Sequence, residues 1–134
     1  MKRNLFTLLL LLSVFALKAS ANTTVKIDSG KIYTAVQTPP AFPGGPDAFT
    51  AYITKNIRYP KIAEQNKTKG RVIVSFVVEK DGTLSNFKVV RGISKELNEE
   101  ALRVLSTSPA WKPGMQNNEA VRVQYTVPVI FSLK

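Results

Sequence analysis

The sequence predicts an α+β domain in which a small three-stranded antiparallel sheet carries two helices on one face. Two apolar, β-branched runs, residues 71–80 and 83–92, are joined by Asp81-Gly82. This pair is typical of a tight hairpin turn with positive φ at both central positions. Apolar residues recur at helical spacing on both sides of this hairpin, and a third strand pattern closes the chain. A sheet of so few strands needs helices to bury one of its faces.

The first helix is predicted over residues 46–56. The prolines and glycines of residues 39–45 exclude regular structure before it. Pro46 suits a first helical turn, and Asp47 complements the positive helix end. Pro60 stops any helix by the preceding residue, and a further helical turn is expected at residues 61–65. The apolar residues of the first helix share one face: Phe49, Tyr52, Ile53 and Ile57.

The second helix follows the hairpin and ends at Pro109, with Ser94 or Asn98 as its cap. Its apolar face comprises Leu97, Ala101, Val104 and Leu105. The acidic cluster Glu96, Glu99 and Glu100 lies at the helix start, where capping and the helix dipole account for it. The predicted core contains apolar residues from every element: Phe76, Val78, Val89, Val104, Leu105, Trp111, Val123 and Val127.

The last strand, "VRVQYTVPVIF" at residues 121–131, contains a proline. Because Pro128 has no backbone N–H, it is expected on an open sheet edge with its nitrogen facing outward. The odd-numbered residues then pair inward, while Gln124, Thr126 and Ile130 present backbone groups outward. Such an edge is either blunted against aggregation, here by Arg122 and Pro128, or accepts an extended peptide as an additional strand.

The first 21 residues have the three parts of a secretory signal. Lys2 and Arg3 supply the positive charge, residues 5–17 are apolar, and Ala19-Ser20-Ala21 suits a signal peptidase. We expect cleavage after Ala21, and the alternative is an uncleaved membrane anchor, although a span needs ~20 apolar residues. Residues 22–39 are expected to form a connector in which weak alternation leaves a short strand possible.

Composition argues against an enzyme. The chain has no His and no Cys, which excludes disulfides, thiolate metal sites and the commonest general base, and no cofactor is expected. Removing 21 of 134 residues, three of 19 basic residues and no acidic residue leaves 113 residues with a charge of +7. This charge suits solubility, and its alternative reading is a polyanion-binding module. The scattered bases and the lack of stacking aromatics argue against that module, and no nucleic acid is expected.

Six motifs in a fixed order carry a family resemblance. Each is weak alone, but the ordered set is specific. The motifs are "FPGG" at 42–45, "RYP" at 58–60, "GRVIVSFVVEKDG" at 70–82, "EALRVL" at 100–105, "PAWKPG" at 109–114 and "VRVQYTVPVIF" at 121–131. Residues 40–134 therefore resemble the C-terminal domain of TonB, the periplasmic energy transducer of Gram-negative outer-membrane transport.

The resemblance implies the same three-stranded fold, a periplasmic location and a peptide-binding role. In the family, the last strand pairs with the TonB box of an outer-membrane receptor, and the Tyr-Pro segment lies nearby. Arg58 and Lys61 flank that segment. Because of their charge, and not because of a family motif, we expect them to contact acidic groups of the receptor. The expected partner-binding residues are Arg58, Tyr59, Pro60, Lys61, Val121, Arg122, Val123, Gln124, Tyr125, Thr126, Val127 and Ile130.

The pattern departs from the family in its N-terminal part. TonB proteins that transmit force resemble a machine with an anchor helix and a long Pro-rich spacer, whereas residues 22–39 reach only ~60 Å when extended. The expected peptide binding therefore carries over from the family, whereas energy transduction does not follow from the resemblance. The alternatives are a free periplasmic adaptor and a domain that self-associates into a homodimer. Partners in an inner-membrane complex, with the domain anchored on the periplasmic side, are a further expectation.

Overall fold

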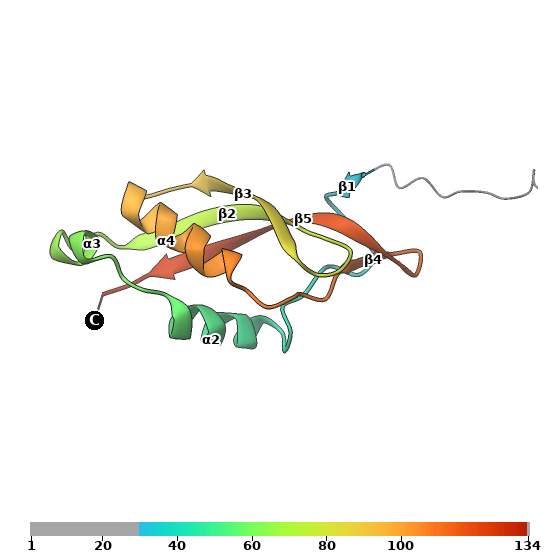
Figure 1. The fold of residues 1–134 in the computed structure, drawn as a ribbon, viewed down its shortest axis with the longest axis horizontal. Coiled ribbons are helices and arrows are strands. Elements are labelled where there is room, and N and C mark those ends of the chain that lie inside the picture. The colour runs from blue at the N-terminus through green and yellow to red at the C-terminus, as the bar shows by residue number, and fades with distance from the viewer. Residues whose placement is uncertain (1–29, 134) are drawn as a thin grey trace, which may run out of the picture.

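The computed structural model describes residues 30–133, which form a curled sheet with helices along one face (Figure 1). The predicted helices at 46–56 and 61–65 are confirmed to the residue, and the fold class is α+β as expected. In chain order the elements are β1 (Ile32–Tyr33), α2 (Pro46–Asn56), α3 (Lys61–Gln65), β2 (Gly70–Val78), β3 (Leu84–Arg91), α4 (Lys95–Ser106), β4 (Gly114–Gln116) and β5 (Glu119–Phe131).

The ladder between β2 and β5 is the centre of the sheet. It runs antiparallel without a register shift, from Gly70 opposite Phe131 to Val78 opposite Val123. The strand order is β1-β5-β2-β3, and β4 also pairs with β5. The predicted number of three strands is wrong because β1 and β4 add to the sheet. Strands of two and three residues are too short to leave a periodic signal in the sequence.

Part of the expected connector lies against this sheet. β1 pairs in parallel with Arg122 and Val123 of β5. Thr38 then exchanges two backbone hydrogen bonds with Met115, at 3.1 and 2.8 Å. Residues 30–39 are therefore built into the domain through backbone pairing.

The connection between β2 and β3 differs from the predicted two-residue turn. The amide of Glu79 donates to the carbonyl of Thr83 at 2.8 Å, so three residues form the loop, and of these only Gly82 has positive φ (88°). The Asp81 carboxylate accepts from the amide and hydroxyl of Thr83, at 3.0 and 2.7 Å. These bonds hold Asp81 in its place before the glycine, and they lower its pKa. A Cβ on Gly82 would lie 2.0 Å from the carbonyl oxygen of Trp111, so this position requires glycine.

The helices bury their apolar faces on one side of the sheet. In Figure 1, α4 lies across β2 and β3, and α2 lies along β5. Ser94 caps α4, because its Oγ accepts from the Leu97 amide at 3.2 Å. All predicted core residues are buried except Val89, which is half-buried and packs against the core. Full burial of one large apolar side chain contributes about 1.5–3 kcal/mol to stability.

An aromatic cluster joins the start of α2 to the sheet. Phe42, Phe49 and Trp111 make edge-to-face contacts, with ring centroids 5.4–5.7 Å apart. Trp111 also packs on Tyr125 of β5 at 5.6 Å, and its Nε1 donates to Ser108 Oγ at 2.9 Å. The prediction that Trp111 is a core residue is confirmed by its 5% exposure. Such pairs contribute about 0.5–1.5 kcal/mol each beyond area burial, which helps to hold the start of α2 against the sheet.

Glu100 connects the two long helices. Its carboxylate accepts from Arg103 Nε at 2.7 Å and from the Arg58 amide at 2.5 Å, and Arg103 also donates to the Asn56 carbonyl at 2.8 Å. Burial by itself would raise the pKa of Glu100, but the hydrogen bonds from Arg103 and Arg58 lower it below the usual value. The prediction that capping and the helix dipole explain this residue is therefore wrong. Glu100 is a buried residue whose hydrogen bonds connect α4 to the end of α2.

We expect Glu100→Gln to lower the free energy of unfolding at neutral pH by about 1–3 kcal/mol, because the partly buried bonds from Arg103 lose their charged acceptor. Because the folded-state pKa lies below the unfolded one, the advantage of the wild type is present above the ordinary pKa of 4.5. This extra stability of the wild type disappears as the pH falls through the folded-state pKa of Glu100. Urea denaturation at a series of pH values measures both effects.

The matched control is Glu99→Gln in the same helix. The Glu99 side chain is 65% exposed and lies 4.0 Å from Lys95, so its loss should change stability by less than about 0.5 kcal/mol. A stability difference for Glu100→Gln that stays constant down to acidic pH would show that the ionised Glu100 carboxylate does not stabilise the fold through these hydrogen bonds.

Candidate functional site: the open edge of β5

The site has two parts, a stretch of unpaired strand edge and a groove beside it. Val121 pairs with Gly114 of β4, and Arg122 and Val123 pair with β1. β1 and β2 lie on opposite sides of β5. Beyond Val123, no strand within residues 30–133 pairs with β5 on the side away from β2. The open edge is therefore residues 124–130, which is shorter than the predicted 121–130.

Pro128 fixes which backbone groups face this edge. The β2–β5 ladder passes through the pair Ile73 and Pro128 without interruption. In an antiparallel ladder, opposed residues alternate between pairs that exchange two hydrogen bonds and pairs that exchange none. A proline cannot belong to the first kind, because it has no N–H. The polar groups of the even-numbered residues thus point away from β2, in agreement with the sequence-based expectation.

The outward groups comprise the N–H and C=O of Gln124, Thr126 and Ile130, and the C=O of Pro128. The side chains of all four residues are exposed, whereas Val127 and Val129 are buried toward the helices. Ile130 is a large apolar residue that is 62% exposed. The edge therefore presents a regular row of hydrogen-bonding groups next to apolar surface.

A groove of about 530 Å³ runs along this edge. Its walls are the loop at residues 39–46, one face of α2 and the edge of β5. α2 contributes Phe49, Thr50, Ile53 and Thr54, and β5 contributes residues 125–128 together with Ile130. The lining contains no charged side chain. The loop reaches this position because Gly44 and Gly45 adopt positive φ, and the Gly45 amide donates to the Phe42 carbonyl at 2.8 Å.

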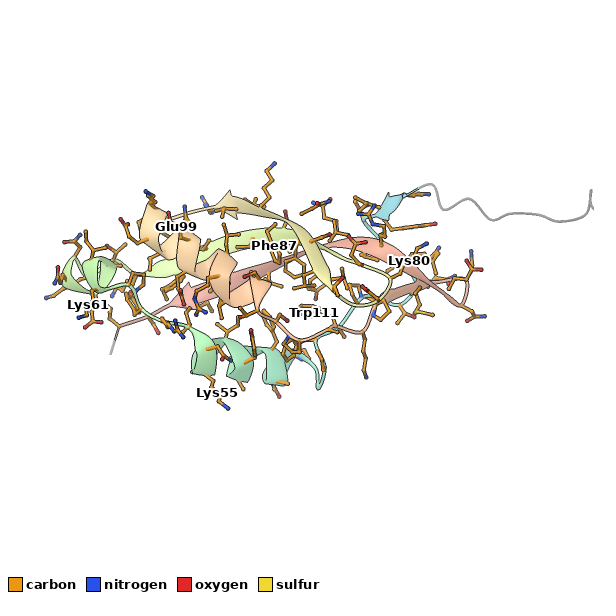
Figure 2. All side chains as sticks on the ribbon, viewed as in Figure 1. Lys55, Lys61, Lys80, Phe87, Glu99 and Trp111 are labelled. Atoms are coloured by element: carbon orange, nitrogen blue, oxygen red, sulfur yellow. The ribbon has the colours of Figure 1, made fainter. Side chains whose placement is uncertain are left out.

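The Tyr-Pro segment lies at the far end of β5. Tyr59 packs edge-on against Phe131, with 5.7 Å between ring centroids, and its hydroxyl donates to the Thr68 carbonyl. Neither Arg58, Pro60 nor Lys61 lines the groove. In Figure 2, Lys61 lies on α3 at the opposite end of the molecule from Lys80. The structure thus brings Tyr59 to the end of the strand but leaves its two basic neighbours outside the groove.

Arg122 is engaged within the chain. Its Nε and Nη2 donate to the Glu79 carboxylate at 2.7 and 3.1 Å, and its Nη1 donates to the Gly30 carbonyl at 2.8 Å. Hydrogen bonds from Arg122 and from Ser85 hold the pKa of Glu79 below its usual value. Arg122 therefore fastens the segment before β1 to the sheet.

The sequence reasoning missed one wall of the groove. In the sequence, Phe42 is only part of a motif, and Phe49 and Ile53 are only part of the apolar face of a helix. Their position opposite the strand edge depends on the path of residues 39–46, which periodicity does not report. The sequence signal for this wall is the "FPGG" motif followed directly by a helix that begins with proline.

Two other kinds of site are not found within the described part of the chain. No group of His, Cys, Asp or Glu among residues 30–133 could hold a metal ion. No helix in the same range is long and apolar enough to span a membrane. The apolar run at residues 5–17 lies outside the described residues.

A family model described as the C-terminal part of Gram-negative bacterial TonB protein matches residues 55–133, which is more than half of the chain. The chain belongs to the TonB C-terminal domain family. The resemblance inferred from the six motifs is thereby confirmed. The match includes α3, α4 and the whole of β5, and it begins near the end of α2. The open edge therefore lies inside the part of the chain that the TonB family shares.

Known TonB proteins are similar to this chain in sequence and fold. Protein TonB of Helicobacter pylori strain J99 is 35% identical over 86 residues, which cover 63% of this chain and 29% of that protein. Protein TonB of strain 26695 is 34% identical, with coverage of 63% and 28%. The chain thus matches less than a third of these relatives. The solution structure of the H. pylori TonB C-terminal domain has a TM-score of 0.50 at 29% identity, covering 66% of this chain and 92% of that one.

Amide hydrogen exchange tests the outward orientation of the even-numbered residues in this TonB domain. We expect slow exchange at Tyr125, Val127 and Val129, whose amides face β2, and fast exchange at Gln124, Thr126 and Ile130. Exchange followed by NMR on the free protein reads each amide separately. Equal protection of neighbouring odd and even residues would mean that a further strand covers this edge.

Proposed function

We propose that this TonB domain acts in TonB-dependent transport by binding an extended segment of an outer-membrane receptor, the TonB box, as an additional strand on residues 124–130 of β5. The observation that carries the proposal is the row of outward backbone groups set against an uncharged, mostly apolar groove. Main-chain hydrogen bonds give such a complex its affinity, and pockets for alternate side chains give it specificity.

The opposite edge of the sheet is less suited to a guest strand. β3 shifts register against β2 twice, between Ile73 and Val74 and between Ser75 and Val77. Asn86 in the same strand has a positive φ of 52°. Bulges of this kind twist an edge and interrupt its row of hydrogen-bonding groups. β5, by contrast, keeps one register over its whole pairing with β2, which supports β5 as the docking strand.

The groove suits a short guest that alternates in side-chain direction. A guest strand on β5 directs every second side chain toward α2, where Phe49 and Ile53 form an apolar wall. The remaining side chains lie beside Thr126 and Ile130 on the exposed face. A guest can make a handful of backbone hydrogen bonds, each worth about 0.5–1.5 kcal/mol net. Docking and ordering the guest cost several kcal/mol, so we propose micromolar or weaker affinity for an isolated peptide.

We also propose a periplasmic location, reached by export with removal of residues 1–21. Mass spectrometry of the exported protein is expected to show a chain that starts at Asn22. Force transmission needs attachment at both ends of a chain, so such a start corresponds to a free adaptor that binds receptor boxes. An intact Met1 would contradict the cleavage and correspond to a tethered domain.

Titration of the purified domain with a TonB-box peptide, followed by NMR, tests the binding. We expect shifts at residues 124–130 and at the groove side of α2, and newly slow exchange at the amides of Gln124 and Thr126. Shifts centred on β3 or α4 would contradict the proposal.

A proline at position 126 gives a sharper test. Thr126→Pro removes one outward N–H without removing a bond to β2, so peptide binding should weaken about fivefold or more. Thr126→Val is the matched control, because it also replaces the Thr126 side chain but keeps the N–H, and it should bind more tightly than Thr126→Pro. If both variants bind equally well, the guest does not pair with this edge.

A further inference from the structure

The same edge that accepts a guest strand is also complementary to itself. Two copies of this chain, related by a two-fold axis, can place their β5 edges side by side as antiparallel strands. The outward residues of one copy then oppose the outward residues of the other, because only these carry free backbone groups. Selective binding of a foreign strand therefore requires a structural feature that disfavours pairing with a second copy.

We infer that Pro128 is this feature. It is a specificity-determining residue that favours a guest strand of another protein over a second copy of this chain. The inference rests on the proposed strand addition at β5 and names the residue that controls it. Pro128 lies among the outward-facing residues and is exposed. It therefore removes a hydrogen-bond donor from the outer edge while the ladder to β2 stays complete.

The missing donor counts differently in the two complexes. A guest strand, parallel or antiparallel, meets one Pro128 and leaves one of its carbonyls without a donor. A symmetric pair contains two copies of Pro128, so every antiparallel register that includes this residue loses two bonds. In the register that opposes Gln124 with Ile130 of the second copy, each Pro128 opposes Thr126, and both losses fall at the centre of the interface.

Ring geometry adds to this difference. The Cδ of a proline occupies the place of the amide hydrogen, so it points at the carbonyl of the opposing strand. A short peptide can bulge at that residue and keep its other bonds. Two copies of a strand that is fixed to β2 through nine consecutive residue pairs cannot both bend away. The free-energy cost of pairing two copies is therefore larger than the loss of two hydrogen bonds by itself.

The variant Pro128→Val restores the donor and introduces a β-branched residue, which suits a strand. One hydrogen bond corresponds to about a fivefold change in an equilibrium constant, and two to about 25-fold. We therefore expect the variant to bind the TonB-box peptide about fivefold more tightly. Its dimerisation constant should rise about 25-fold or more above that of the wild type. Titration by NMR measures the first effect, and sedimentation equilibrium over a concentration series measures the second.

Val90→Ile on β3 serves as the control, because it changes an exposed apolar side chain outside the groove and alters no backbone donor, and it should leave both constants unchanged. A dimerisation gain for Pro128→Val that is no larger than its gain for the peptide would overturn the inference, as would equal gains from the control. Failure of the wild type to bind peptide would refute the proposed function. The sedimentation result would still decide separately whether Pro128 opposes self-pairing.

Discussion

The uninterrupted ladder between β2 and β5 is the constraint from which the rest of the molecule follows. Because Pro128 lies within this ladder, only the odd-numbered residues of β5 can bond to β2. The same alternation buries Val127 and Val129 under the helices and exposes Thr126 and Ile130. The orientation of the backbone and the position of the core are thus set together. A shift of register by one residue would expose the core and place the proline where a hydrogen bond is required.

The two edges of the sheet have different fates. β3 ends the sheet with a bulged strand. On the side away from β2, the first part of β5 pairs with β1. Only the later part of the strand stays open, and it is there that the aromatic cluster and α2 form a groove. In the proposed complex, a binding edge that is already ordered before the guest arrives adds little to the entropic cost of association.

Charge serves the architecture of this domain more than its groove. The full chain carries a formal charge of +10, yet no charged side chain lines the groove. Two close ion pairs among the described residues instead join segments of the fold. Glu100 and Arg103 fasten α2 to α4, and Glu79 and Arg122 fasten the segment before β1 to the sheet. A binding surface that relies on backbone groups and apolar contacts is less sensitive to salt than a basic surface that binds a polyanion.

The sequence by itself determined the family, the fold class, the bounds of α2 and α3, and the outward orientation of Pro128. These features depend on local rules, namely periodicity, helix boundaries and the missing amide of proline, that act within a few residues. Only the tertiary structure decided the length of the open edge, the loop at Gly82, the role of Glu100 and the groove. Each of these depends on segments distant in sequence: β1 meets β5, Trp111 meets Gly82, Arg58 meets Glu100, and α2 lies along the strand. Contacts of this kind leave no periodic trace in the chain, because packing rather than local conformation creates them.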